Sequence, residues 1–135
     1  MSKMKYIYPV FALGMTILIV YLSSIPDLVI LKSGSRADQI LSNLAHIPAY
    51  GILTILWMKS FNGTLAYRNH IFVNMLVLAG LVLFSVSDEI HQSFVLGRTA
   101  SIIDVGLDLG GILLGFGVLK FSRLTNFTGP QNREP

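Results

Sequence analysis

The sequence contains no cysteine among its 135 residues. A disulfide framework and a thiolate metal site are therefore both excluded. Charged residues make up only 13% of the chain, whereas 53% of it is hydrophobic. Soluble globular domains carry about a quarter charged residues, so this composition argues against an ordinary soluble domain. The length leaves room for one domain and shows no obvious second one.

Long apolar stretches predict membrane-spanning helices. Residues 6–24 hold 19 residues without a charge, close to the roughly 20 that span a bilayer. A cleaved signal peptide is the alternative. The apolar core of a signal peptide, however, has only about 7–15 residues, and no A-x-A-like cleavage site follows this segment. Further helices are predicted over 38–58, 71–87 or a little beyond, and 101–121. The predicted fold class is therefore all-α: a polytopic membrane protein with four transmembrane helices in a compact bundle.

The predicted helical domain covers residues 1–124. Residues 125–135 are polar and contain two prolines. We expect them to form a flexible C-terminal tail, since chain ends of this kind are often poorly ordered.

Lysine and arginine are unevenly distributed between the two predicted sides of the membrane. With four spans both termini share one side, which holds seven of the ten basic residues, and Lys32, Arg36 and Arg98 lie on the other. The positive-inside rule then places both termini in the cytoplasm. The net charge of +3 follows from this topology, so the lipid bilayer is the predicted partner and nucleic acid is not. The oligomeric state stays open.

Polar residues recur at helical spacing on three of the predicted helices. Positions three or four apart share a face of a helix. Such faces collect polar and small residues towards the outer end: Asn43, His46 and Tyr50; Ser85, Asp88 and Gln92; Asp104, Asp108, Gly111 and Gly115. Small residues indicate a face that packs closely on a neighbouring helix. Because ionisable groups in membrane helices usually face a bundle interior or a wet cavity, this pattern predicts one outward-opening polar pocket.

Several of these residues also have a purely structural explanation. Asp104 completes a capping-box pattern at the start of the fourth helix, whereas Asp108 lies one turn deeper. Tyr50 is compatible with an interfacial aromatic residue, and His46 with a structural histidine. Glu89 lies off the centre of the polar face and is compatible with a solvated surface position.

Arg98 follows a glycine in the segment ahead of the fourth helix. A guanidinium, free backbone N–H groups and a helix dipole together can hold a phosphate or a carboxylate. Asp88 and Glu89 approach the C-terminal end of the third helix, where the dipole disfavours anions. We therefore also predict that Arg98 folds back to make a bidentate contact with one of these two acids.

The polar residues resemble the motifs of the VanZ-like membrane proteins. The resemblance rests on His46-x-x-x-Tyr50, on Asp88-Glu89-x-x-Gln92-x-Phe94-x-x-Gly97-Arg98, and on Asp104 with Gly111 and Gly115. It covers roughly residues 41–115 and implies a bacterial plasma-membrane setting near cell-wall precursors; the name-giving member is associated with teicoplanin resistance. The chain departs from the family pattern at Ser42-Asn43, where many members carry an Asp-Lys pair, and at Asp108, where asparagine is usual.

Two functions from different classes fit these residues. The first is the binding or conversion of an anionic, lipid-linked cell-envelope ligand, which the resemblance connects with glycopeptide resistance. The candidate catalytic residues are then Asp88, Glu89, His46 and Asp108, and the candidate binding residues are Arg98, Gln92, Tyr50, Asp104 and Asn43. Carboxylates and a histidine also suit a hard metal ion, but no recognised metal motif occurs, so neither a metal nor another cofactor is assigned. The second function is a non-catalytic accessory or scaffold protein whose polar faces hold the bundle together.

Overall fold

The computed structural model describes residues 4–26, 36–62, 70–98 and 101–127. Over these ranges the chain forms four helices and no strand: α1 (Met4–Ser23), α2 (Arg36–Asn62), α3 (His70–Gln92) and α4 (Ile102–Phe127). The predicted all-α class is therefore confirmed, and each helix overlaps a predicted one. The predicted boundary between domain and tail falls inside α4, and residues 128–135 lie outside the described residues.

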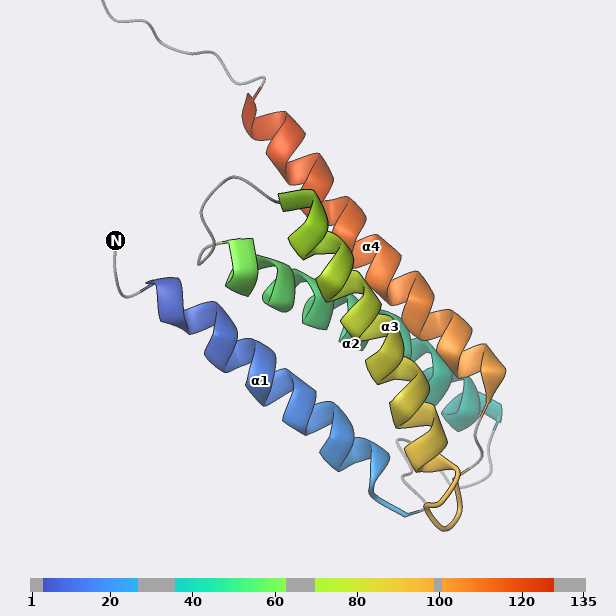
Figure 1. Ribbon diagram of the computed structural model, residues 1–135. Helices are drawn as coiled ribbons and strands as arrows, with labels where there is room; N and C mark the ends of the chain where they lie inside the picture. The colour runs from blue at the N-terminus through green and yellow to red at the C-terminus, as the bar shows by residue number, and fades with distance from the viewer. Residues whose placement is uncertain (1–3, 27–35, 63–69, 99–100, 128–135) are drawn as a thin grey trace, which may run out of the picture.

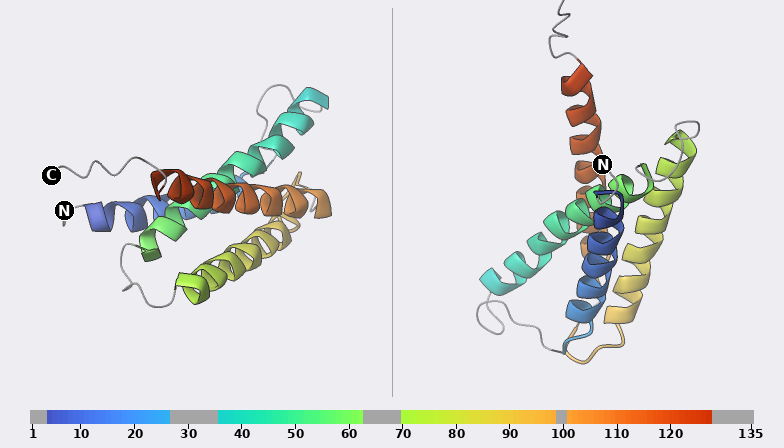
Figure 2. Two further views of the ribbon diagram at one scale, coloured as in Figure 1. Left: turned by 90° about the horizontal axis from the view of Figure 1, so that it is seen from above. Right: turned by 90° about the vertical axis from the view of Figure 1, so that its left-hand side faces the viewer.

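The helices are arranged so that four of their ends lie together. The C-terminal ends of α1 and α3 lie at the same end of the molecule as the N-terminal ends of α2 and α4, at the lower right of Figure 1. α2 crosses the other helices obliquely, as Figure 2 shows. We call this end of the bundle the polar end, defined by Ser23, His46, Asp88, Arg98 and Asp108.

Helix α2 packs most extensively against α4, and glycines set the distance between them. A Cβ atom on Gly111 would collide with the carbonyl oxygen of Ile47, and one on Gly115 with that of Gly51. Only residues without a side chain permit this approach of two backbones. The prediction that Gly111 and Gly115 are packing positions is therefore confirmed.

The outward faces of α1, α3 and α4 are apolar. Ile71 is 81% exposed and Ile102 is 89% exposed, and many other large hydrophobic side chains lie on the same faces. The segments Ile71–Gln92 and Ile102–Ser122 are long and apolar enough to cross a bilayer, and Ile7–Ser23 is a shorter apolar helix. Soluble monomers rarely expose apolar surface on this scale, so the helices are suited to a lipid environment.

Candidate functional site

Asp108 of α4 is buried at a junction with α2 and α3, with only 1% of its surface exposed. Its Oδ1 atom accepts a hydrogen bond from Nδ1 of His46 at 2.8 Å. Its Oδ2 atom accepts one from the hydroxyl of Ser85 at 2.7 Å. We call these three residues the Asp108 cluster. Both carboxylate oxygens are occupied, and the bond to Nδ1 leaves Nε2 as the remaining polar atom of the His46 ring.

A second buried aspartate, Asp88 of α3, joins α1 to α3. Its Oδ2 atom accepts hydrogen bonds from the hydroxyl of Ser23 at 2.8 Å and from Nε2 of Gln92 at 3.1 Å. Gln92 Nε2 also lies 3.3 Å from the oxygen of Ser23. We call these three residues the Asp88 cluster. The other oxygen of Asp88, Oδ1, is buried and has no hydrogen-bond partner in the described chain.

Ser23 is the residue of this site that the sequence did not reveal. Serine at the end of an apolar helix is common, and no spacing distinguishes Ser23 from its neighbour Ser24. Only the packing of α1 beside α3 brings it to Asp88, and an α1–α3 contact has no local sequence signal.

Glu89 holds the start of α4. Its Oε1 atom accepts a hydrogen bond from the backbone N–H of Ser101, and the Ser101 hydroxyl accepts one from the N–H of Ile103. The capping-box explanation of Asp104 is therefore wrong, because the N–H that this box would use donates to Glu89 instead. Glu89 is buried, so the surface explanation offered for it is wrong as well. Glu89 Oε2 and Asp104 Oδ1 lack a hydrogen-bond partner among the described residues.

Arg98 contacts α1 instead of the acids of α3. Its Nη2 atom donates to the carbonyl oxygen of Leu22 at 2.7 Å, and its Nε atom donates to that of Ile25 at 3.4 Å. The predicted bidentate contact with Asp88 or Glu89 is wrong: within the described ranges the only carboxylate ion pair is that of His46 with Asp108.

The reason for this difference is the C-terminal end of α1. The last carbonyl groups of a helix have no partner inside it, and a cation is favourable there. Gly97 has a φ of 77°, a conformation that residues with a side chain rarely adopt. This turn precedes Arg98, whose guanidinium reaches α1.

A cavity of about 140 Å³ lies between α1, α2 and α3, and we call it the polar cavity. Its polar lining residues are Ser23, His46, Tyr50, Asp88, Gln92 and Arg98. Two of them carry a buried polar atom without a hydrogen-bond partner in the described chain, the Tyr50 hydroxyl and Asp88 Oδ1. Buried polar atoms are normally paired because an unpaired one costs about 1–3 kcal/mol.

Eight of the nine predicted site residues thus divide into three groups. His46, Tyr50, Asp88, Gln92 and Arg98 line the polar cavity. Asp108 lies behind it and is connected through His46. Glu89 contacts the start of α4 and Asp104 belongs to its first turn. Asn43 is not part of the cavity wall and belongs to none of these groups. No group of three His, Cys, Asp or Glu residues in the described chain is arranged to hold a metal ion.

Comparison with known proteins gives one family. No curated protein and no solved structure matches the sequence significantly. The VanZ/LLP1 family model matches residues 5–123, which include α2 and α3 in full, most of α1 and α4, and both aspartate clusters. The match spans most of the 135 residues, and the chain therefore belongs to the VanZ/LLP1 family.

Proposed function

We propose that this protein spans the plasma membrane four times and binds the anionic headgroup of a lipid-linked cell-envelope ligand in its polar cavity. Helices α3 and α4 support the spanning topology by their length and composition, and α1 contributes a shorter apolar helix. The apolar part of α1, Ile7–Ser23, covers about 26 Å at ~1.5 Å per residue, close to a hydrocarbon core of about 30 Å.

Helix α2 needs a different argument, because it is not among the apolar segments. It packs against α1, α3 and α4, and Tyr50, Leu53 and Thr54 are almost fully buried. The face of α2 that its neighbours cover does not meet lipid, so this face tolerates polar residues that a lipid-facing surface does not.

The proposed orientation has both termini in the cytoplasm, as the seven-to-three distribution of Lys and Arg favours. The polar end then lies at the outer leaflet. The parent chain has no cysteine, so single cysteines can report the topology. We expect cysteines at Ser2 and Thr128 to resist a membrane-impermeant thiol reagent in intact cells, and a cysteine at the exposed Ser93 to react. The reverse pattern would overturn the orientation.

The main support for the proposed ligand is that several polar groups of the polar cavity have no partner in the described chain. Arg98 lines the cavity without a carboxylate partner in the described chain, and Nη1 of its guanidinium makes no hydrogen bond there. A phosphate suits this group in charge and geometry. Asp88 Oδ1 and the Tyr50 hydroxyl suit hydroxyl or amino groups on the same ligand, since the carboxylate needs a donor.

The His46–Asp108 pair adds the means to move a proton at this cavity. A carboxylate that accepts from Nδ1 orients the imidazole and leaves Nε2 to accept or donate a proton. His46 lines the cavity, so a ligand bound there would meet this ring.

A non-catalytic accessory role is the second candidate, and the Asp108 cluster favours it. Both oxygens of Asp108 are already paired with groups on α2 and α3, which is what a purely structural polar contact requires. In this case the cavity would hold water, and the charge of Arg98 would stabilise the C-terminal end of α1 without binding a lipid.

Lipid retention separates the two candidates. We expect the purified protein to retain phosphatidylglycerol, which carries a phosphate and hydroxyl groups, in preference to phosphatidylcholine, as read by native mass spectrometry. Loss of one charge-assisted contact costs about 1.5–3 kcal/mol, so Arg98→Gln should weaken this retention by about tenfold or more. Lys120→Gln removes a cation from an exposed position of α4 and should have no such effect. Equal retention by both variants would favour the accessory role.

The proposal also predicts an effect on the susceptibility of cells to glycopeptide antibiotics. If the bound lipid is a cell-wall precursor, expression in a susceptible Gram-positive host should raise the inhibitory concentration of teicoplanin. Arg98→Gln should abolish the increase at equal protein level. An increase that persists in this variant would disconnect susceptibility from the polar cavity.

A further inference from the structure

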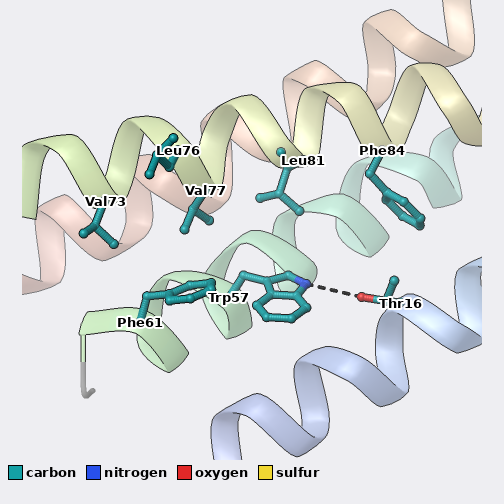
Figure 3. Close-up of a pocket in the computed structure, with 9 residues that line it drawn as sticks. Thr16, Trp57, Phe61, Val73, Leu76, Val77, Leu81 and Phe84 are labelled. Atoms are coloured by element: carbon teal, nitrogen blue, oxygen red, sulfur yellow. Dashed lines mark hydrogen bonds between the residues drawn. The ribbon is translucent and has the colours of Figure 1, made fainter. Parts of the chain in front are cut away.

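A larger cavity opens between α1, α2 and α3, away from the polar end. It measures about 460 Å³, within the range of small-molecule pockets. Apolar side chains of α3 form one wall, and Trp57 and Phe61 of α2 lie opposite, with Thr16 of α1 at one side (Figure 3). Its two polar side-chain groups, Trp57 Nε1 and the Thr16 hydroxyl, bond to each other at 3.3 Å. We call it the apolar groove. Nothing in its lining is left to recognise a polar ligand.

The apolar groove lies next to the polar cavity between the same three helices, and on α2 two turns separate Tyr50 of the cavity from Trp57 of the groove. On α1 the two are one turn apart, from Thr16 to Ile19, and on α3 one turn apart, from Phe84 to Asp88. The rings of Phe84 and Tyr50, which belong to the groove and the cavity respectively, lie 6.0 Å apart between centroids. A molecule with a polar end and an apolar end could therefore occupy both.

We infer that the apolar groove holds a hydrocarbon chain of the same phosphate-bearing lipid whose headgroup binds in the polar cavity. This inference rests on the proposed function. The groove spans α3 from Val73 to Phe84, about 16 Å at ~1.5 Å per residue, which is close to half of a hydrocarbon core of about 30 Å. This stretch begins one turn from Asp88, which borders the polar cavity, so a chain attached to a headgroup there would run along α3 towards the N-terminal end of this helix.

Selection of this lipid must come from its headgroup. The apolar faces of α1, α3 and α4 place hydrocarbon around the bundle, and lipid tails are as apolar as the groove, so the groove alone prefers no lipid over another. The guanidinium of Arg98 at the adjoining cavity supplies the preference for an anionic lipid. A phosphate held there keeps its own chain beside the groove.

Trp57 allows a direct test, because it is the only tryptophan of the chain and lies in the groove. The full-length protein is placed in nanodiscs of phosphatidylcholine with a fixed fraction of either chain-brominated phosphatidylglycerol or chain-brominated phosphatidylcholine. Quenching is measured against the same mixture without bromine. We expect brominated phosphatidylglycerol to quench Trp57 more strongly than the zwitterionic lipid at equal fraction.

Two glycines provide a matched pair of variants. Gly80 lines the groove and a Cβ atom there meets nothing within 4 Å, and the same holds for Gly14 on the exposed face of α1. Gly80→Leu fills the groove without a backbone collision and should abolish the excess quenching by the anionic lipid. Gly14→Leu should preserve it, and Arg98→Gln should abolish it.

The outcomes separate this inference from the proposed function. If phosphatidylglycerol retention depends on Arg98 but the excess quenching is absent, or survives in Gly80→Leu, the groove inference is wrong and headgroup binding stands. If retention does not depend on Arg98, the proposed function fails with it. Excess quenching that is lost in Gly14→Leu as well would also contradict the groove as the site.

Discussion

The Asp108 cluster and the Asp88 cluster are each built on a buried aspartate near the polar end, but they use that aspartate differently. Asp108 has both oxygens paired, with groups on α2 and on α3. Asp88 has two donors on Oδ2 and none on Oδ1 within the described chain. A carboxylate that is fully paired holds helices together, whereas one with a free buried oxygen has capacity left for a ligand.

The two clusters also differ in what surrounds them. Asp108 shares its helix with Gly111 and Gly115, where α4 meets the backbone of α2. Asp88 borders the polar cavity beside Arg98. We therefore expect changes around Asp108 to affect mainly stability, and changes around Asp88 to affect mainly lipid binding.

The largest effect on stability is expected at Asp108. Asp108→Ala leaves both His46 and Ser85 without their partner, and each hydrogen bond to a charged group contributes about 1.5–3 kcal/mol. Thermal unfolding of the detergent-solubilised protein should show this loss. An Asp108→Ala variant that unfolds at the same temperature as the parent would contradict the structural role of the Asp108 cluster.

The next effect concerns the close approach of α4 to α2. Gly111→Ala puts a methyl group into the carbonyl oxygen of Ile47, and overpacking of this kind costs about 1–3 kcal/mol. The neighbouring Gly110→Ala is the control, because a Cβ atom there meets nothing within 4 Å. Equal stability of the two variants would show that α2 and α4 can move apart near Gly111 without a measurable cost in stability.

A smaller loss of stability is expected at Asp88. After Asp88→Ala the Ser23 and Gln92 side chains can still bond to each other, so the cost should be about 1 kcal/mol, the net value of a typical hydrogen bond. The retention of phosphatidylglycerol should nevertheless fall clearly. If unfolding changes as much as in Asp108→Ala, the two clusters have the same role.

The smallest effect concerns Arg98 and Asp88 together. Because Arg98 bonds to the carbonyl groups of Leu22 and Ile25 and not to this acid, the losses of stability in Arg98→Ala and Asp88→Asn should add. A double-mutant cycle on solubilised protein should give a coupling energy below about 0.5 kcal/mol. A larger coupling would mean that the two side chains meet.

Much of the fold was predictable because each helix carries its signal locally. An uncharged run of nearly spanning length marked α1, long apolar stretches marked α3 and α4, and the spacing of Gly111 and Gly115 marked the face that meets α2. The C-terminal ends of α2 and α4 were predicted too early, at 58 and 121, whereas these helices end at Asn62 and Phe127. In α3 the polar residues Asp88 and Gln92 belong to the helix, as their spacing predicted, but the contact of Asp88 with Ser23 of α1 is tertiary and was not predictable.

The site was predictable in part for the same reason. Faces of α2 and α3 brought His46, Tyr50, Asp88 and Gln92 together, as their spacing predicted. The partners of Arg98 and Glu89 were not predictable, because both belong to helix ends. Arg98 bonds to carbonyl groups at the end of α1, and Glu89 to an N–H at the start of α4. Backbone groups carry no residue-specific signal, so sequence spacing favoured side-chain pairs instead.

The central claim, that the Asp88 side of the polar end binds an anionic lipid while the Asp108 side holds the helices, is tested most directly by lipid-dependent stability. A ligand that binds the folded state raises its unfolding temperature. Addition of phosphatidylglycerol should raise the unfolding temperature of the parent and of the destabilised Gly111→Ala by similar amounts, and should leave that of Asp88→Ala almost unchanged. A full increase in Asp88→Ala would contradict the account.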